Sequence, residues 1–362
     1  MLRKIIEPGA VIGILGDGQL GRMTAIAAAQ LGYRVAVLGP GGRDSPTGQV
    51  SWWAEAWSDG VQVGEEILDQ FCRLVSVVLV EWENVPLALV DAIEKRGVFV
   101  CPGREALRIS QDRLLEKELA RSLGIPTAGC LAVGHDTIEQ MPIAPEAFIL
   151  KTRRDGYDGK GQVRLQRGMS FQKAWCELGS VPCILETVVD FAAEMSIIVA
   201  RSSTQVVVYG PFENEHKDGI LASTRYPSRH PLVVNAIVTG SADRYSRQLA
   251  EALDIHGLLA IEYFVSASGD VIFNEMAPRP HNSGHLTIEC CITSQFEQYV
   301  RAACGLPLGR ADFRSSGRMR NLIGDDASCP VRLLEESAAL HLYGKGEARP
   351  GRKMGHQTFI LD

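Results

Sequence analysis

Short apolar runs alternate with longer amphipathic segments over the first hundred residues of the chain. Runs with strand character lie at 10–15, 33–38, 75–80 and 97–101, and the segment after the first run is rich in Ala and Gln, which favours a helix. Strands buried on both faces of a parallel sheet read as continuous apolar runs, and helices connect them. The pattern therefore predicts a doubly wound, Rossmann-like α/β domain over residues 1–104.

The pattern changes after Pro102 and Gly103. Residues 104–123 are charged and amphipathic and are followed by Gly124 and Pro126, which predicts a single long helix that ends there. The remaining elements are expected as strands at 147–152, 183–187, 194–200 and 205–209, helices at 242–253 and 286–304, and short strands with glycine-rich turns at 318–360.

Two β-rich runs between residues 261 and 275 predict a hairpin. A two-residue turn at Ser268-Gly269 would place Glu262 directly opposite Glu275, with Asn274 on the other face. Like charges directly opposed across a strand pair repel each other, so a cation is expected between them, and Mg²⁺ held by carboxylate oxygens is the natural candidate. The alternative is a solvated hairpin whose two glutamates diverge into water.

The loop after this hairpin concentrates Arg and His. Within seven residues it contains Arg279, His281, Asn282, Ser283 and His285. A guanidinium group binds phosphate or carboxylate through two parallel hydrogen bonds. A polar surface loop would normally contain more Lys, Glu and Ser and less His, so we interpret this segment as an anion-binding loop beside the metal.

The first glycine-rich turn, G-D-G-Q-L-G at 16–21, lies between an apolar strand and a helix. This arrangement aims a helix N-terminus at a phosphate. A dinucleotide site also needs an acidic residue at the end of the second strand, where this chain has Leu38-Gly39-Pro40. The turn therefore argues against a nicotinamide cofactor and leaves a phosphate at the helix N-terminus as an open prediction.

A second glycine-rich element gives a stronger phosphate signal. Lys151, near the end of a strand, precedes a loop with Gly156, Gly159 and Gly161. Glycines let backbone N–H groups approach phosphate oxygens, and the lysine adds a positive charge. The alternative is an exposed hairpin tip, because Gly, Asp and Lys are ordinary turn residues.

Composition limits the class of protein. The 362 residues are 46% hydrophobic and 22% charged, which is typical of a soluble globular protein of two or three domains. A formal charge of −6 argues against nucleic-acid binding, and no apolar run approaches the ~20 residues that span a bilayer. The nine cysteines have no disulfide or zinc spacing, and the N-terminus lacks a signal-peptide cleavage pattern, so we expect a cytoplasmic protein with reduced thiols.

Eight sequence strings carry a resemblance that covers nearly the whole chain. They are I-G-I-L-G-D-G-Q-L-G-R-M at 12–23, Q-D-R-L-L-E-K at 111–117, L-K-T-R-R-D-G-Y-D-G-K-G-Q at 150–162, H-K-D-G-I-L at 216–221, N-E-M-A-P-R-P-H-N-S-G-H at 274–285, T-S-Q-F-E-Q at 293–298, N-L-I-G at 321–324 and R-P-G-R-K-M-G-H at 349–356. By these strings the chain resembles the ATP-grasp superfamily and, within it, the family of N5-carboxyaminoimidazole ribonucleotide synthases. Asp17 and Asp155 depart from the residues usual in that family.

The resemblance implies an α/β (α+β ATP-grasp) fold in four parts. After the Rossmann-like domain at 1–104 it implies a small central lobe at 105–189, a C-terminal lobe with the Mg²⁺ site at 190–310 and a small β-rich segment at 311–362. It also implies an ATP site between the two lobes and a homodimer. The implied ATP-binding residues are Arg113, Lys151, Gly156, Tyr157, Asp158, Gly159, Lys160, Gly161, Gln162, Glu186, Thr187, Val188, Val189, Glu194, His216, Asn274 and Glu275, with Mg²⁺ held by Glu262 and Glu275.

The resemblance further implies the acceptor and the reaction. The acceptor is 5-aminoimidazole ribonucleotide, and bicarbonate attacks the γ-phosphate of ATP to give carboxyphosphate, which then carboxylates the amine of the acceptor. The implied acceptor-binding residues are Gly18, Gln19, Leu20, Glu83, Arg154, Tyr157, Arg279, His281, Lys345 and Arg352, and the implied catalytic residues are Tyr157, Arg279, His281 and Lys353.

Three other functions compete with this interpretation. Another ATP-grasp ligase, such as the formate-dependent glycinamide ribonucleotide transformylase, would share the ATP site and differ in the acceptor loop. A nicotinamide-dependent oxidoreductase is disfavoured by the missing acidic residue after the second strand. A non-catalytic nucleotide-binding protein would be expected to lack Glu262, Glu275 or Lys151, and all three are present.

Overall fold

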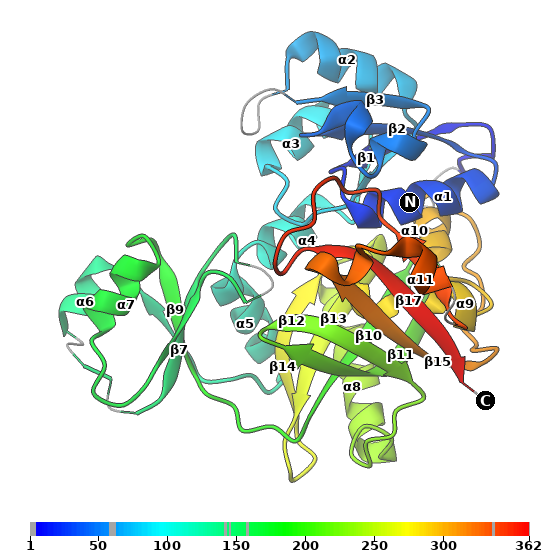
Figure 1. Cartoon of the computed structure of the whole chain (residues 1–362). Coiled ribbons are helices and arrows are strands. Elements are labelled where there is room, and N and C mark those ends of the chain that lie inside the picture. Colours follow the sequence, from blue (N-terminus) through cyan, green and yellow to red (C-terminus); the bar gives the residue numbers. More distant parts are fainter. Residues whose placement is uncertain are drawn as a thin grey trace.

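Three β-sheets organise the part of the chain that the computed structural model describes, namely residues 5–57, 63–140, 143–144, 146–156, 159–334 and 337–361. They have five, four and eight strands. In Figure 1 the five-stranded sheet lies near the N-terminus, the four-stranded sheet lies to one side, and the eight-stranded sheet includes the C-terminal strands. Within these described residues no helix has the length and apolar character that crossing a membrane requires.

The N-terminal sheet is parallel, with strand order β3-β2-β1-β4-β5. In β1, Ile12 and Ile14 face a core shared with α1 and α10, whereas Val11 and Leu15 face a core shared with α2 and α3. Helices thus cover both faces, which confirms the predicted doubly wound domain. Its elements are β1 (Val11–Leu15), α1 (Gln19–Gln30), β2 (Arg34–Gly39), η1 (Gly42–Asp44), η2 (Gly48–Val50), β3 (Trp53–Ala56), α2 (Glu65–Leu74), β4 (Val77–Val80), α3 (Leu87–Lys95) and β5 (Val100–Cys101).

Two helices replace the single helix predicted at 104–123. They are α4 (Arg104–Ser110) and α5 (Arg113–Ser122). The side chain of Asp112 accepts a hydrogen bond from the backbone N–H of Leu114 at 3.1 Å and so caps α5. The prediction was wrong because Asp112 was read as part of an uninterrupted amphipathic pattern rather than as the start of a second helix.

The four-stranded sheet is antiparallel, in the order β6-β9-β7-β8, and projects to one side of the molecule in Figure 1. Leu150, Leu185, Phe171 and Trp175 belong to a core that this sheet shares with α6 and α7. Its elements are β6 (Cys130–Val133), α6 (His135–Gln140), β7 (Phe148–Thr152), β8 (Gln162–Leu165), α7 (Phe171–Glu177) and β9 (Cys183–Thr187).

The eight-stranded sheet is antiparallel, with strand order β14-β13-β10-β11-β12-β15-β17-β16. Alternate residues of β10 face opposite cores: Ile197 packs with residues of α8, and Ile198 packs with residues of α10. The elements up to α10 are β10 (Ala193–Arg201), β11 (Val206–Lys217), β12 (Ile220–Tyr226), α8 (Ala236–Ala252), β13 (Gly257–Val265), β14 (Val271–Ala277), η4 (Asn282–Gly284), α9 (Thr287–Cys290) and α10 (Gln295–Ala303). The helix predicted at 286–304 is therefore two helices, since Ser294 caps the second one.

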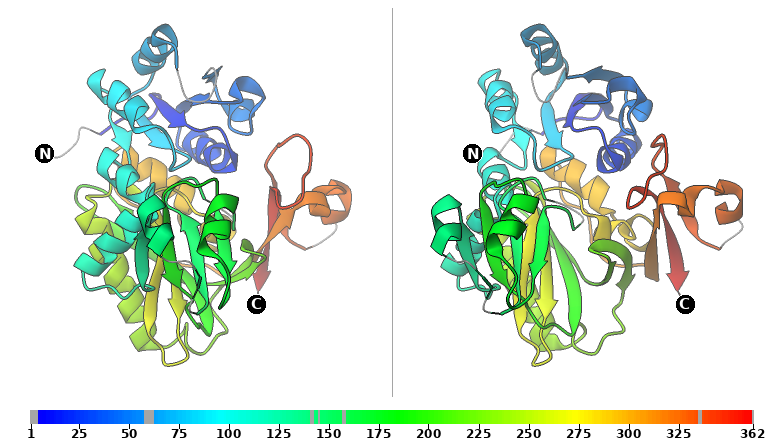
Figure 2. Two further views of the ribbon diagram at one scale, coloured as in Figure 1. Left: turned by 90° about the vertical axis from the view of Figure 1, so that its left-hand side faces the viewer. Right: turned by 60° about the vertical axis from the view of Figure 1, so that its left-hand side comes forward.

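The C-terminal strands extend this sheet instead of forming a separate one. Strand β15 pairs with β12 and with β17. Figure 2 shows the orange and red C-terminal strands at one side of the molecule. The loop between β16 and β17 reaches the N-terminal domain, where Gln49 donates a hydrogen bond to the carbonyl of Gly344 at 2.9 Å. The elements of the tail are β15 (Ser316–Ile323), η5 (Gly324–Ala327), α11 (Pro330–Leu334), β16 (Ala339–Leu342) and β17 (Lys353–Leu361).

Candidate active site

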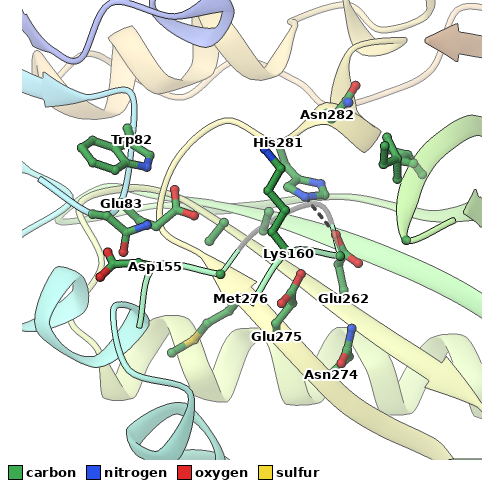
Figure 3. Close-up of a pocket in the computed structure, with 18 of the residues that line it drawn as sticks. Trp82, Glu83, Asp155, Lys160, Glu262, Asn274, Glu275, Met276, His281 and Asn282 are labelled. Atoms are coloured by element: carbon green, nitrogen blue, oxygen red, sulfur yellow. Dashed lines mark ion pairs between the residues drawn. The ribbon is translucent and has the colours of Figure 1, made fainter. Parts of the chain in front are cut away.

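A cavity of about 880 Å³ lies where the three sheets and the C-terminal tail meet. Its walls come from the start of α1, the end of β4, the start of α5, the loop after β7, strands β13 and β14 with the loop that follows, and the segment 345–353. Figure 3 shows the part of the cavity around Glu262 and Glu275. Sites between domains and lobes are common places for ligands, so this cavity is the candidate active site.

The predicted pairing of Glu262 with Glu275 is confirmed, although the turn and the strand register differ from those predicted. Val265 pairs with Val271, so the turn is longer than the two residues predicted. The register then shifts between Glu262 and Tyr263, which makes Asn274 an extra residue on β14, a β-bulge. The longer turn displaces the register by one residue and the bulge restores it.

The bulge also changes where Asn274 lies. A regular strand would turn the side chains of Asn274 and Glu275 to opposite faces, as the sequence predicted. Both residues instead line the cavity, and Figure 3 shows them near Glu262. The prediction for Asn274 was wrong because it assumed a strand without a bulge. The cavity therefore has three oxygen-bearing side chains together, a set that fits a hard cation such as Mg²⁺.

Histidines hold Glu262 in its charged form. His281 Nε2 lies 2.9 Å from Glu262 Oε1, and His216 Nε2 lies 3.9 Å from Glu262 Oε2. Burial acts to raise the pKa of Glu262, but the hydrogen bond and charge of His281, with the charges of His216 and Lys353, outweigh it and lower the pKa to about 2. His216 Nδ1 in turn lies 3.0 Å from Glu194 Oε2. The carboxylate is therefore ionised and oriented before any ligand binds.

Glu186 is enclosed in the protein and does not line the cavity. Its Oε2 lies 2.5 Å from Lys151 Nζ and its Oε1 lies 3.2 Å from Lys117 Nζ. Burial acts to raise the pKa of Glu186, but the two lysines outweigh it and lower the pKa. In this geometry Glu186 holds the Lys151 side chain, which does line the cavity.

The base of the second glycine-rich loop is fixed to the start of α5. The guanidinium of Arg113 donates to the carbonyls of Thr152 and Gly156, both at 2.8 Å. Arg153 forms two hydrogen bonds with Asp112, at 3.0 and 2.6 Å. Arg113, predicted to contact phosphate, thus also anchors the loop, because its guanidinium has donors on several sides.

Opposite this loop, Glu83 and Arg279 form a double ion pair. Arg279 Nε and Nη2 both donate to the Glu83 carboxylate, the latter at 2.9 Å. Burial acts to raise the pKa of Glu83, but Arg279 outweighs it and lowers the pKa. The pair joins the N-terminal domain to the loop after β14, and the segment from Lys345 to Lys353 closes the same side.

The first glycine-rich turn encloses a carboxylate of the chain itself. The backbone N–H groups of Gly18 and Leu20 donate to Glu81, which extends from the end of β4. A Cβ atom at Gly18 would lie 2.4 Å from Glu81 Oε1, and one at Gly16 would lie 2.7 Å from Glu81 Oε2. Burial raises the pKa of Glu81 although Arg279 opposes it. The sequence had left open whether a phosphate binds at the N-terminus of α1. In the structure this N-terminus binds the side chain of Glu81.

Most predicted site residues meet at the cavity. Those that line it are Gln19, Leu20, Glu83, Arg113, Lys151, Arg154, Gly156, Gly159, Lys160, Gln162, Glu194, His216, Glu262, Asn274, Glu275, Arg279, His281, Lys345, Arg352 and Lys353. Of the described residues, those predicted for the site that do not line it are Gly18, Gly161, Glu186, Thr187, Val188 and Val189. Tyr157 and Asp158 lie outside the described residues.

Sequence reasoning missed several residues of the site. Glu81 and Trp82 stand next to Glu83 in V-E-W-E-N-V, at the carboxyl end of a parallel strand, and that position alone could have drawn attention to them. Glu116 also lines the cavity, and Lys117 lies behind it. Their only sequence signal is their place in Q-D-R-L-L-E-K, where they read as ordinary charges on an exposed helix.

Profiles of three protein families match the chain. The ATP-grasp domain matches residues 118–296, the ribonucleotide synthetase preATP-grasp domain matches residues 10–111, and the phosphoribosylaminoimidazole carboxylase C-terminal domain matches residues 318–362. The first profile covers the four-stranded sheet and most of the eight-stranded sheet, and the last covers the tail strands.

Individual relatives match over almost the full chain. The N5-carboxyaminoimidazole ribonucleotide synthase of Brucella melitensis is 43% identical over 370 residues, which cover 99% of this chain and 99% of that protein. The N5-carboxyaminoimidazole synthetase of Staphylococcus aureus, solved in complex with ADP, is 32% identical with a TM-score of 0.90, over 99% of this chain and 95% of that one. The Aspergillus clavatus synthase, solved with ADP and 5-aminoimidazole ribonucleotide, is 29% identical with a TM-score of 0.84, over 97% and 94% of the two chains.

Proposed function

The chain belongs to the family of N5-carboxyaminoimidazole ribonucleotide synthases, and from that membership we propose that it carboxylates 5-aminoimidazole ribonucleotide with ATP and bicarbonate. The products are N5-carboxyaminoimidazole ribonucleotide, ADP and phosphate, which makes the protein an ATP-dependent C–N ligase of de novo purine biosynthesis. One observation carries this proposal: the same cavity is lined by Lys151, by the paired Glu262 and Glu275, and by basic residues of the C-terminal tail, namely Lys345, Arg352 and Lys353.

The nucleotide side of the cavity is proposed to lie between the four-stranded sheet and strands β13 and β14. Lys151, fixed by Glu186, and Arg113 carry positive charge toward this side, where the phosphates of ATP need it. Mg²⁺ held by Glu262 and Glu275 would offset further phosphate charge. The glycine-rich loop from Gly156 is expected to cover the phosphates, and the adenine contacts proposed for residues 186–189 would involve their backbone, since the Glu186 side chain is already paired.

The acceptor side is proposed to lie between the N-terminal domain and the tail. The remaining ligand is a ribonucleotide, whose phosphate requires cations, and we propose that Arg154, Lys345 and Arg352, which line the cavity, bind it. Glu83 and Arg279 are proposed to contact the acceptor as a pair, since each already orients the other. Gln19 and Leu20 complete this wall from the start of α1, next to the turn at Gly18.

The proposed reaction has two steps. An oxygen of bicarbonate attacks the γ-phosphorus of ATP and ADP leaves, which gives carboxyphosphate. The amine of the acceptor then forms a bond to the carboxyl carbon, directly or after release of CO₂, and phosphate leaves. Arg279, His281 and Lys353 line the cavity, and their hydrogen-bond donors are proposed to stabilise negative charge that develops on the transferred group. Enclosure of the cavity would protect carboxyphosphate from water.

We also propose a cytoplasmic homodimer, with the functional division at residues 104, 189 and 310 that the sequence predicts. All nine cysteines are free thiols, which supports a reducing compartment. The dimer rests on the family resemblance alone, and sedimentation equilibrium of the purified chain tests it: a single species with the monomer mass would refute it.

A phosphate-release assay tests the proposed function. The protein is supplied with Mg-ATP and bicarbonate, with and without 5-aminoimidazole ribonucleotide, and in parallel with formate and glycinamide ribonucleotide. We expect rapid phosphate release only with the aminoimidazole substrate. Turnover on formate and glycinamide ribonucleotide instead would keep the ATP site and refute the acceptor, and no turnover with either would refute the ligase activity.

A further inference from the structure

The strand that bears Glu275 lies at the open edge of the large sheet. β14 is the first strand in the sheet order; among the described strands it pairs with β13, and an isolated bridge joins Phe273 to Thr127 on its other side. Beyond that bridge, no described strand pairs with the backbone N–H and C=O groups on the outer side. Buried backbone groups need hydrogen-bond partners, so other parts of the chain must supply them here.

Helix α5 and the segment after it supply these partners. The N–H of Phe273 donates to the carbonyl of Pro126 at 2.8 Å. Lys117 Nζ donates to the carbonyl of Asn274 at 2.7 Å, and Glu116 Oε1 accepts from the N–H of Met276 at 3.2 Å. Two consecutive charged residues of one helix thus bind β14 on either side of Glu275.

These two contacts fix the backbone of Glu275 itself. The Asn274 carbonyl belongs to the peptide group before the Cα atom of Glu275, and the Met276 N–H belongs to the peptide group after it. Peptide groups are planar, so the orientations of the two planes set the φ and ψ angles of the residue between them. The bulge at Asn274 interrupts the regular ladder with β13 at this point, and the contacts from α5 hold the opposite, outer side of the same segment.

Stability alone does not explain why the ionisable side chains of Glu116 and Lys117 make these contacts with β14. Glu116 and Lys117 are 3% and 2% exposed, and burying ionisable groups costs free energy that hydrogen bonds and opposite charges repay only with good geometry. Lys117 also binds Glu186, which holds Lys151, so one side chain contacts both the metal-bearing strand and the anchor of the phosphate-binding lysine. In some proteins buried ionisable groups specify one arrangement of the chain, and the contacts of Glu116 and Lys117 fit that role.

We propose that Glu116 and Lys117 are positioning residues of the cation site: by holding the Asn274 carbonyl and the Met276 amide, they aim the Glu275 carboxylate at the cation that Glu262 shares. This inference rests on the proposed function for the identity of the cation as Mg²⁺. It assigns no contact with substrate to either residue.

The experiment compares variants that remove a contact with variants that keep it. Glu116→Leu removes the acceptor for the Met276 amide, whereas Glu116→Gln keeps a carbonyl oxygen at that place. Lys117→Met removes the donor to Asn274 while its stem still covers the Phe273 ring, over which Lys117 Nζ now lies at 5.5 Å. Glu118→Gln changes an exposed charge on the same helix and is the matched control.

ADP binding is measured by calorimetry over a range of Mg²⁺ concentrations, and amide hydrogen exchange is measured on peptides that span 271–278. For Glu116→Leu and Lys117→Met we expect the half-saturating Mg²⁺ concentration to rise about tenfold and exchange of these peptides to become faster. Glu116→Gln and Glu118→Gln should stay within about twofold of the wild type on both measures. ADP affinity without Mg²⁺ reports separately whether Lys151 has been disturbed.

Wild-type Mg²⁺ dependence in a folded Glu116→Leu or Lys117→Met protein would overturn the inference. If Glu116→Leu does not fold, Lys117→Met decides alone. If the wild type itself shows no Mg²⁺ effect on ADP binding, the proposed magnesium site fails instead, and the hydrogen exchange then decides: unchanged exchange at 271–278 in Lys117→Met overturns the inference, and faster exchange supports it.

Discussion

The two glycine-rich turns of this chain look alike in sequence, but different groups approach their glycines in the structure. The turn at 16–21 and the loop at 156–161 each follow a strand and each predict contact with a phosphate. In the first, the glycines make room for Glu81. In the second, Gly156 and Gly159 line the cavity, and Arg113 anchors the base of the loop.

The difference shows what a glycine does and does not reveal. Glycine permits a close approach to the backbone, but the sequence does not say which group approaches. At Gly18 the approaching group is a carboxylate from β4, which already satisfies backbone N–H donors of α1. The neighbouring side chains differ between the two cases: Lys151 precedes the second loop and lines the cavity, whereas the acidic side chain of Glu81 occupies the first turn. The glycines of the first turn therefore hold a side chain of the protein itself, whereas the second loop is the one that we propose to bind phosphate.

Of the substitutions considered, removal of the Glu275 charge should lower activity most, because Glu275 lies on the proposed phosphate-binding side of the cavity with the second glycine-rich loop. Glu275→Gln keeps the size of the side chain but weakens a cation ligand, and changes even in groups that only support ligands cost about 10–100-fold. We expect substrate-dependent phosphate release to fall by more than about 100-fold, with the melting temperature unchanged. An activity within a few-fold of the wild type would remove Glu275 from the metal site.

Replacing Lys151 should break nucleotide binding on the same side. Lys151→Met removes the charge that Glu186 orients toward the cavity, and loss of a charge-assisted contact is worth about 1.5–3 kcal/mol. We expect ADP to bind about 10–100-fold more weakly by calorimetry. Gln19→Ala, at the first turn, serves as the control and should leave ADP affinity unchanged; equal losses in both would contradict the division into two regions.

The same substitution in each glycine element tests the comparison directly. A Cβ atom at Gly18 would press on Glu81, so Gly18→Ala should lower the free energy of unfolding by about 1–3 kcal/mol and leave ADP affinity unchanged. The matching substitution in the second loop is Gly161→Ala. Gly161 has φ +70, where a side chain costs about 1–2 kcal/mol, and this strain should distort the loop and weaken ADP binding.

Urea unfolding and ADP titration of both variants give the answer. Gly21→Ala, where a Cβ atom would lie 2.4 Å from Thr47 Oγ1, is a further control for crowding at the first turn and should behave like Gly18→Ala. If Gly18→Ala weakens ADP binding without lowering the free energy of unfolding, the proposed difference between the two glycine-rich elements is wrong.

The smallest expected effect is a pH dependence at the first turn. The pKa of Glu81 is raised in the folded protein, so between 4.5 and that raised value the native state binds more protons than the unfolded state. The stabilising contribution of protonated Glu81 is therefore full below pH 4.5 and is lost as the pH rises through the folded-state value. The slope from one group cannot exceed about 1.4 kcal/mol per pH unit.

Glu81→Gln isolates this contribution from the other carboxylates. The difference in unfolding free energy between wild type and variant should favour the wild type more strongly as the pH falls from 8 toward 4.5. Urea unfolding at intervals of half a pH unit measures it. A difference that does not change with pH would mean that Glu81 titrates normally and is not removed from water.

Local pattern predicted the N-terminal sheet well because both faces of its strands are buried, and burial leaves a continuous apolar signal. The pairing of Glu262 with Glu275 was predicted correctly although the turn was not, because the bulge at Asn274 compensated for the longer turn. Contacts between distant segments left no such signal. The ion pair of Glu83 with Arg279 forms only when the N-terminal domain and the loop after β14 come together.

The same reason explains what was misread. Asp112 ended a predicted helix early because its side chain caps a second one, a preference that competes with the apolar period. For Glu186 the resemblance implies an adenine contact, which stays a prediction; the structure adds that its carboxylate pairs with two lysines that come from other elements. Sequence shows which residues can act, and tertiary contacts determine which of them are already engaged.

The pairing of β15 with β12 has a consequence for how the chain folds as it is synthesised. β12 ends at Tyr226, and its outer neighbour does not begin until Ser316. While the ribosome adds the residues between them, the growing sheet has an open edge at β12 as well as the one that α5 covers at β14. The last elements to emerge therefore both complete the cavity wall at Lys353 and close the edge along which nascent chains could pair with one another.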